Sequence, residues 1–317
     1  MTIPSATPAS IDELRRRLAK QLYVADDGLA TSIYLALKLG RPLLLEGEAG
    51  VGKTEVAKVL SAALGADLIR LQCYEGLDVN HAVYEWNYAR QLIEIRLGEA
   101  DGAPTGDRRA RAGELFGPDF LIERPLLQAL RDGRPRPPVL LIDELDRADE
   151  EFEGYLLELL SDFQITIPEL GTIRAAAPPV VVITSNRTRE LHDALKRRCL
   201  YAWIDYPSFE KELRIVTTKV PEAPTALAEQ VTGFVQELRR AELYKVTGVS
   251  ETLDWVAALV ALDKQELDAA TIERTLGIVL KTQEDMQSMR SERIQDLLNR
   301  AKAPGARASQ PDAAARG

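Results

Sequence analysis

A glycine-rich run followed by a lysine and a threonine is the first stretch of the chain whose residue types and spacing could do chemistry. Eight residues fit the pattern G-x-x-x-x-G-K-[ST]: Gly47, Glu48, Ala49, Gly50, Val51, Gly52, Lys53 and Thr54. Glycines let a backbone wrap closely around a phosphate, the lysine can reach β- and γ-phosphates, and the threonine hydroxyl can bind Mg²⁺. The alternative is a turn that contains Lys-Thr by chance. The apolar strand-like run 43–45 before the loop and the helical spacing after it favour a loop that binds ATP with Mg²⁺.

Two carboxylates follow another apolar run. Asp143 and Glu144 come directly after the residues VLLI, which is how a parallel sheet presents acidic groups at its carboxyl edge. We expect Asp143 to bind the metal, directly or through water, and Glu144 to polarise a water molecule for attack on the γ-phosphate. The alternative is that both acids only begin the next helix, where negative charge suits the helix dipole.

Three further residues are candidates for the same site. Asn186 follows the run VVVITS and could orient the attacking water, although asparagine is also common in turns at strand ends. Arg197 and Arg198 precede the run LYAWI, at an edge where an arginine can complete the active site of a neighbouring subunit. The alternative for both arginines is a solvated basic turn.

The elements that must position these residues are short apolar strands alternating with helical stretches. We expect five strands: 43–45, Leu68–Gln72, Val139–Asp143, Val180–Thr184 and Leu200–Ile204. Strands of this kind, separated by helices, predict the α/β class and a parallel sheet with right-handed crossovers.

The connection between the second and third predicted strands is too long for one helix. Within it we expect a helix over residues 85–97 and a loop over 98–113, which is either functional or merely solvated. Farther on, residues 165–167 and 172–174 predict a β-hairpin.

The remaining segments define the predicted domains. Residues 1–22 form an N-terminal segment that is partly disordered, 23–206 the nucleotide-binding core, 207–300 an α-helical domain, and 301–317 a disordered tail. In the helical domain no strand-like run remains, and the predicted helices are Phe209–Lys219, 227–243, 251–262 and 271–299.

Composition narrows the choice of partners and compartment. The chain has 317 residues, a net charge of -9 and a pI near 5.1, which argues against binding to duplex nucleic acid because phosphate neutralisation needs clustered basic residues. No secretory signal is recognisable and no apolar run approaches the roughly 18 residues of a membrane span. The cysteines and histidines share no metal-ligand spacing: Cys73, Cys199, His81 and His192. We therefore expect a cytoplasmic protein with reduced thiols and no membrane span.

Taken together, the stretches GEAGVGKT, VLLIDELDRA, VVVITSN and LHDALKRRC resemble an AAA+ ATPase and, more narrowly, the MoxR family. The stretches RLQCYEGLD, YEWNYARQL and FLIERPLLQAL resemble the CoxD-like branch, which accompanies aerobic carbon monoxide dehydrogenase. The resemblance covers residues 20 to 260. It implies a P-loop AAA+ core with a five-stranded parallel sheet and a C-terminal α-helical lid. The roles it implies are Walker A for Lys53 and Thr54, Walker B for Asp143 and Glu144, sensor 1 for Asn186, and arginine finger for Arg198, with Arg197 as second choice.

The same resemblance implies ATP and Mg²⁺ as cofactors, a homo-hexameric ring, a partner with a von Willebrand factor A domain, and a chaperone-like role in maturing a molybdenum- and copper-containing enzyme. One departure affects the mechanism: the stretch that matches the family's lid arginine reads Ser250-Glu251-Thr252, so no residue takes the sensor 2 role. A nucleotide-gated assembly scaffold with little turnover therefore stays open as an alternative. The acidic balance disfavours a third possibility, a motor on nucleic acid.

Overall fold

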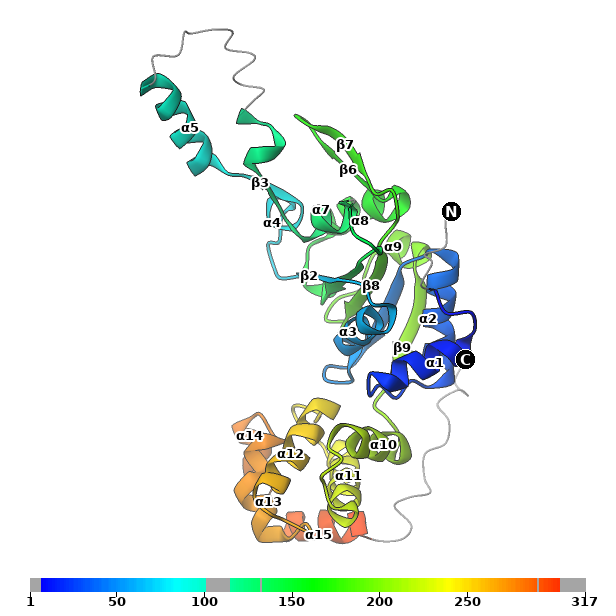
Figure 1. Ribbon diagram of the computed structural model, residues 1–317. Coiled ribbons are helices and arrows are strands. Elements are labelled where there is room, and N and C mark those ends of the chain that lie inside the picture. The colour runs from blue at the N-terminus through cyan, green and yellow to red at the C-terminus, as the bar shows by residue number, and fades with distance from the viewer. Residues whose placement is uncertain (1–6, 101–114, 132, 290, 303–317) are drawn as a thin grey trace. The chain divides into compact units, whose positions relative to one another are not determined.

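Two compact units make up the chain. The computed structural model describes residues 7–100, 115–131, 133–289 and 291–302, shown as a ribbon in Figure 1. Residues 1–17, 26–46 and 54–203 belong to what we call the sheet unit, and residues 18–25, 47–53 and 204–317 to what we call the helical unit. Of the residues predicted to be disordered at the two ends, 1–6 and 303–317 lie outside the described residues, whereas residues 7–10 are described and Ala301 and Lys302 are helical.

The sheet has five strands in the order β2-β5-β8-β1-β9. Their bounds are β1 Leu43–Gly47, β2 Leu68–Gln72, β5 Val139–Asp143, β8 Val180–Ser185 and β9 Leu200–Ile204. The predicted α/β class and parallel five-stranded sheet are confirmed. Every residue of β1 and β5 is buried, whereas exposure alternates along β2, because β2 is an edge strand.

The helices around the sheet begin and end at residues that favour helix termini. The bounds are α1 Ile11–Lys20, α2 Asp27–Leu39, α3 Lys53–Leu64, α4 Val79–Ala82, α7 Pro125–Leu130, α8 Glu150–Asp162 and α9 Asp193–Arg198. Asp26 accepts a hydrogen bond from the Leu29 amide at the start of α2, and Gly40 ends α2 in the left-handed conformation. Asp149 caps α8 in the same way through the Phe152 amide.

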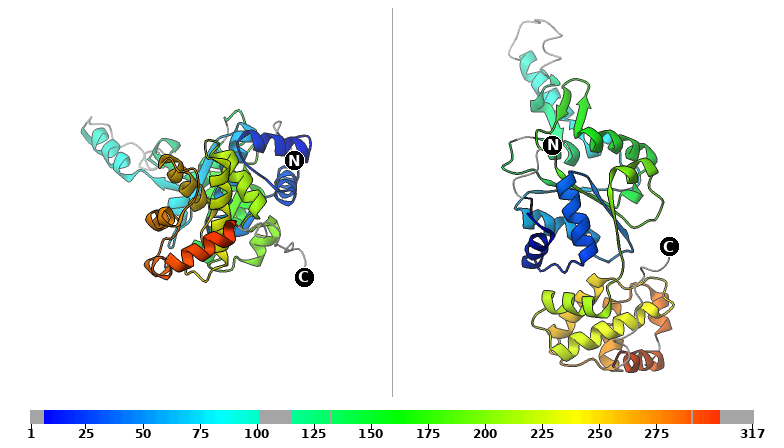
Figure 2. Two further views of the ribbon diagram at one scale, coloured as in Figure 1. Left: turned by 90° about the horizontal axis from the view of Figure 1, so that it is seen from below. Right: turned by 90° about the vertical axis from the view of Figure 1, so that its right-hand side faces the viewer.

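The helical unit contains α10 to α15, and Figure 2 shows it from two further directions. The bounds are α10 Phe209–Lys219, α11 Thr225–Arg240, α12 Val249–Ala261, α13 Ala269–Thr275, α14 Gln283–Ser288 and α15 Ser291–Lys302. The prediction of one helix over 271–299 is wrong. A 3-10 turn over Leu276–Ile278 follows α13, and Thr282 then caps a new helix by accepting from the Asp285 amide.

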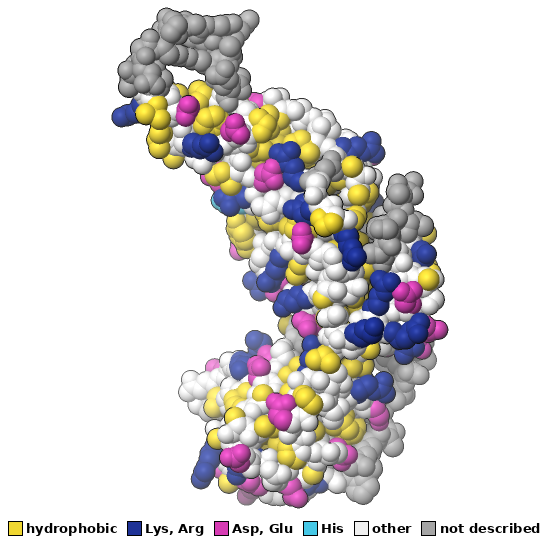
Figure 3. Space-filling model, viewed as in Figure 1, with side chains coloured by type: hydrophobic (Ala, Val, Ile, Leu, Met, Phe, Trp, Pro, Cys, Tyr) yellow, Lys and Arg dark blue, Asp and Glu magenta, His cyan; other side chains and the backbone are white. Residues whose placement is uncertain are grey.

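The long second crossover holds a short antiparallel ribbon made of β3, Tyr84–Trp86, and β4, Leu121–Glu123. The predicted helix over 85–97 is therefore wrong at its start: Trp86 is in a strand, and helix α5 spans Tyr88–Ala100. The predicted loop 98–113 begins as part of α5, and residues 101–113 lie outside the described residues. Apolar side chains are exposed along α5, as Figure 3 shows, among them Leu92, Ile93 and Leu97. The predicted hairpin is confirmed as β6 Gln164–Ile167 and β7 Gly171–Arg174.

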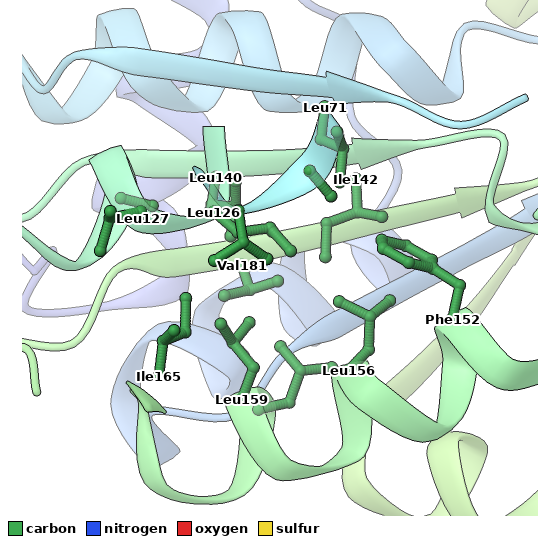
Figure 4. Close-up of a cluster of buried hydrophobic side chains, with 14 of the residues drawn as sticks. Leu71, Leu126, Leu127, Leu140, Ile142, Phe152, Leu156, Leu159, Ile165 and Val181 are labelled. Carbon is green, nitrogen blue, oxygen red and sulfur yellow. The ribbon is translucent and has the colours of Figure 1, made fainter. Parts of the chain in front are cut away.

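The main core of the sheet unit lies between one face of the sheet and the helices α7 and α8. Figure 4 shows Leu71, Leu140, Ile142 and Val181 from the strands meeting Leu127, Phe152, Leu156 and Leu159 from the helices. Because side chains alternate along a strand, the neighbours of these strand residues point to the opposite face. That alternation decides where the candidate site lies.

Candidate active site

The predicted phosphate-binding loop lies between β1 and α3. Gly50 and Gly52 have φ values of 78° and 96°, a region that side chains other than glycine rarely adopt. A Cβ atom on Gly50 would lie 2.9 Å from the Gly248 Cα. Lys53 is only 6% exposed, and its ammonium donates to the carbonyls of Gly47 at 2.8 Å and Glu48 at 2.7 Å. The loop therefore wraps around a buried cation, which suits a bound phosphate chain.

Thr54 and Asp143, the two predicted metal ligands, are in direct contact. The Thr54 hydroxyl donates to Asp143 Oδ1 at 2.9 Å, and the Thr184 hydroxyl donates to the same oxygen at 2.7 Å. Asp143 follows Ile142 in β5, and Thr184 follows Ile183 in β8, so both point away from the core face and toward α3. A buried carboxylate and a hydroxyl in contact are oxygen ligands of the kind that Mg²⁺ prefers.

Glu144 turns away from the strand that carries Asp143. Its φ is 55°, the left-handed region, and its amide donates to the Thr184 hydroxyl at 2.9 Å. The carboxylate accepts a hydrogen bond from Gln72 Nε2 at 3.2 Å and pairs with Arg147 Nε at 2.8 Å. The predicted general base is thus adjacent to the metal-binding pair, with its carboxylate held by two side chains.

Asn186 begins the loop after β8, and a residue that the sequence analysis missed holds that loop. Asp146 is 3% exposed and accepts from the amides of Asn186 at 3.1 Å and Thr188 at 2.9 Å, and from the Thr188 hydroxyl at 2.7 Å. Burial acts to raise the pKa of Asp146, but these hydrogen bonds outweigh it and leave the pKa below its usual range. Asp146 therefore positions the segment that carries Asn186.

Arg197 and Arg198 lie at the end of α9. The Arg198 guanidinium donates to the Ser161 hydroxyl at 2.8 Å and to the Ala194 carbonyl at 3.0 Å. Arg41 donates to the carbonyls of both residues, which fixes this end of the helix. Among the described residues, neither arginine makes a hydrogen bond or an ion pair with Thr54, Asp143 or Glu144. The structure therefore brings together Thr54, Asp143 and Glu144 but not these two arginines.

Arg70 and Gln72 are two more residues of the site that the sequence analysis missed. Both lie on β2, where Gln72 is the register partner of Asp143. Arg70 Nη2 lies 2.5 Å from Asp143 Oδ2 and also contacts the Gln72 side-chain oxygen. The signal was the strand pairing itself: once β2 is placed beside β5, side chains two residues apart on β2 must share the Asp143 face.

The residues present fit Mg²⁺ bound together with ATP better than a protein-only metal site. Among the described residues no cluster of three His, Cys, Asp or Glu side chains could hold a metal ion. Mg²⁺ usually takes one or two protein ligands and completes its shell with phosphate oxygens and water. Cys73 and Cys199 are buried, and burial raises the pKa of each thiol to about 12, so both thiols are protonated at neutral pH.

Several known proteins resemble this chain in sequence or in structure. Residues 42–199 match the family model described as AAA domain (dynein-related subfamily). An uncharacterized protein of Staphylococcus haemolyticus is 25% identical over 287 residues, covering 86% of this chain and 98% of its own. The denitrification regulatory protein NirQ of Stutzerimonas stutzeri is 25% identical over 220 residues, covering 67% of this chain and 69% of its own. A structure of the Thermotoga maritima RuvB Holliday junction branch migration motor is 15% identical, with a TM-score of 0.45, over 86% of this chain and 72% of that one.

The glycine-lined loop and the acidic pair at the ends of parallel strands define a P-loop ATP hydrolase that uses ATP with Mg²⁺. Within that class the chain is an AAA+ ATPase. AAA+ proteins typically assemble into rings. Over the described residues, every helix is too short or too polar to cross a membrane.

Proposed function

We propose that this AAA+ ATPase is of the MoxR type and remodels a client protein during maturation of a metalloenzyme. The observation that carries the proposal is the contact of Thr54 with Asp143 beside Glu144, since it provides a metal site and a base for hydrolysis rather than nucleotide binding alone. Similarity to a denitrification regulatory protein supports the MoxR type. The CoxD-like branch, with a molybdenum- and copper-containing carbon monoxide dehydrogenase as client, rests on the sequence resemblance.

In this proposal the role of each site residue follows from its position in the loop or at the end of a strand. The loop from Gly47 to Lys53 binds the phosphates, and Thr54 and Asp143 hold Mg²⁺, which supplies charge neutralisation at the β- and γ-phosphates when bound. Glu144 accepts a proton from the attacking water, which can reach its carboxylate because the side chain is 33% exposed. Asn186 orients the water from the loop that Asp146 fixes.

The arginine finger acts in trans in this proposal. Arg198 is the first choice and Arg197 the second. Both are exposed at the end of α9, and neither is in hydrogen-bond contact with Asp143. Arg198 is held to Ser161 of α8 and so has a defined position. The assembly that follows is a homo-hexameric ring in the cytoplasm, with residues 23–206 as core, 207–300 as lid and a von Willebrand factor A protein as partner.

A nucleotide-gated scaffold with little turnover is the second candidate function. Thr252 favours it, because the lid position where an arginine would sense the nucleotide holds a buried threonine that donates to Glu212 at 2.8 Å. Single-turnover measurement of phosphate release separates the two candidates. Rapid release of phosphate in that single turnover supports the remodelling ATPase, whereas release that is slow compared with dissociation of the nucleotide supports the scaffold.

Client identity is tested with a variant that binds ATP without hydrolysing it. Tagged Glu144→Gln protein, loaded with ATP and Mg²⁺, is recovered from cells that express the molybdenum hydroxylase and the von Willebrand factor A protein. Recovery of either partner that disappears with Lys53→Ala supports the proposal. Recovery of both partners by Lys53→Ala and Glu144→Gln alike would contradict an ATP-dependent role.

A further inference from the structure

Arg70 neutralises the buried carboxylate of the site. Asp143 is 1% exposed, and its Oδ1 already accepts hydrogen bonds from Thr54 and Thr184. Its second oxygen, Oδ2, is 2.5 Å from Arg70 Nη2. A buried carboxylate needs a cation or several donors to stay charged, and Arg70 is the cation that the structure places there.

The two oxygens of Asp143 are not equivalent for a metal. The Thr54 hydroxyl can keep donating to Oδ1 while its lone pairs face Mg²⁺, because a hydroxyl both donates and accepts. Oδ2 is then the oxygen left for Mg²⁺ or for a water molecule on it. That oxygen is the one that Arg70 holds, and two cations at one carboxylate oxygen repel each other.

Arg70 is placed so that its guanidinium can move away from the Asp143 carboxylate. Its side chain is 48% exposed whereas that of Asp143 is 2% exposed, and β2 is an edge strand. A half-exposed guanidinium regains hydration when it swings outward, and a cation that arrives at Asp143 takes over the neutralisation of the buried carboxylate. A divalent cation that arrives with ATP can therefore displace it.

We propose that Arg70 is an internal competitor of Mg²⁺ at Asp143 and thereby sets the metal concentration at which the site fills. The inference rests on the metal site assigned to Thr54 and Asp143 above. Arg70 is a positioning residue for Asp143 and not a ligand of the nucleotide. Its contact with the Gln72 oxygen, while Gln72 Nε2 donates to Glu144, means that its release also frees the side chain that holds Glu144.

The test is a titration of the intact protein with Mn²⁺, followed by electron paramagnetic resonance in the presence of a non-hydrolysable ATP analogue. Arg70→Gln removes the competing charge, so Mn²⁺ should bind about tenfold more tightly, which is the size expected for losing one neighbouring unit charge. Arg70→Lys keeps a positive charge on a shorter side chain, so its affinity for Mn²⁺ should lie between those of the parent and of Arg70→Gln. Arg300→Gln, which removes an equal charge from an exposed pair on α15, should leave Mn²⁺ affinity unchanged.

A second readout is the melting temperature, measured without nucleotide. Arg70→Gln leaves Asp143 with neutral donors. The melting temperature of the Arg70→Gln protein should therefore be lower than that of the parent, and it should rise more steeply with added Mn²⁺. Unchanged or weaker Mn²⁺ binding in folded Arg70→Gln overturns the proposal. Asp143→Asn tests the metal site separately: Mn²⁺ affinity equal to the parent's would overturn the site itself, whatever Arg70 does.

Discussion

At the scale of single residues, the proposed catalysis depends on side chains that three strands bring to one edge of the sheet. Asp143 of β5 meets Thr184 of β8 and Arg70 of β2, and Thr54 at the start of α3 completes the group. Glu144 follows Asp143 in the chain but leaves the strand in a left-handed turn. The turn sends the side chains of Asp143 and Glu144 in different directions, as the proposed division between metal binding and activation of water requires.

Glu144→Gln should abolish hydrolysis and keep ATP binding. The amide is close in size to the carboxylate and can still contact Gln72, but it cannot accept a proton from water, so kcat should fall by about 10²- to 10⁴-fold. Phosphate release and the Kd for a fluorescent ATP analogue measure the two effects. Glu150→Gln, an exposed acid in the first turn of α8, is the matched control. A kcat within twofold of the parent would show that Glu144 is not the base.

Asp146 should make the loop that carries Asn186 sensitive to acid. Its pKa is lowered in the folded protein, so its contribution to stability is present above the unfolded value of 3.8 and is lost as pH falls through the lower folded value. Asp146→Asn should cost about 1 to 3 kcal/mol of unfolding free energy at pH 7, and the difference from the parent should shrink toward pH 3. Urea denaturation of both proteins at pH 7 and at pH 3 measures the free energies of unfolding. An equal difference between the two proteins at both pH values would contradict the charged hydrogen-bond network.

Sequence reasoning pointed to Lys53 and Thr54 in one short stretch and to Asp143 and Glu144 in another, because the residue pattern within each stretch is itself the signal. It missed Arg70 and Asp146, whose partners lie far along the chain: Arg70 reaches Asp143 only through the pairing of β2 with β5, and Asp146 reaches Thr188 only once β8 is beside β5. Contacts of that kind depend on register, which no local pattern encodes.

At the scale of elements, the strands form where apolar runs are bounded by turn residues, and all five predicted strands are present. The predictions that were wrong concern segments without such boundaries. Trp86 sits in a ribbon of three-residue strands, too short to show alternation. The helix predicted over 271–299 breaks where Gly277 and the cap at Thr282 interrupt it, because local capping outweighs the apolar spacing.

The helical unit contains a buried ion pair whose disruption should be costly. Glu212 on α10 accepts two hydrogen bonds at 2.6 Å from Arg239 on α11, and both side chains are buried. Glu212→Ala leaves the arginine charge unpaired and should lower the free energy of unfolding by about 3 to 5 kcal/mol. Urea denaturation followed by circular dichroism measures it. Arg300→Ala, which breaks an exposed pair on α15, should change it by less than about 1 kcal/mol. Equal effects of the two substitutions would contradict the difference in burial.

At the scale of the whole molecule, the proposed ring should let one subunit complete the site of the next. Arg198→Ala protein keeps its base but lacks the finger, and Glu144→Gln protein keeps the finger but lacks the base. In a head-to-tail ring, mixing the two inactive proteins should restore activity at about a quarter of the interfaces, because contacts in such a ring are heterologous. Mixed activity no higher than the sum of the two separate proteins would contradict a finger that acts in trans. Repeating the mixture with Arg197→Ala decides between the two arginines.

The central claim is that the loop ending in Lys53 and Thr54 and the acidic pair Asp143 and Glu144 form one Mg²⁺-dependent ATP hydrolysis site. The most direct measurement is the steady-state rate of phosphate release from ATP by the purified chain and by Lys53→Ala, each titrated with Mg²⁺. We expect turnover by the parent that rises from background as Mg²⁺ is added, and background release by Lys53→Ala at every Mg²⁺ concentration. Hydrolysis by Lys53→Ala as fast as the parent's, or turnover by the parent that ignores Mg²⁺, would contradict it.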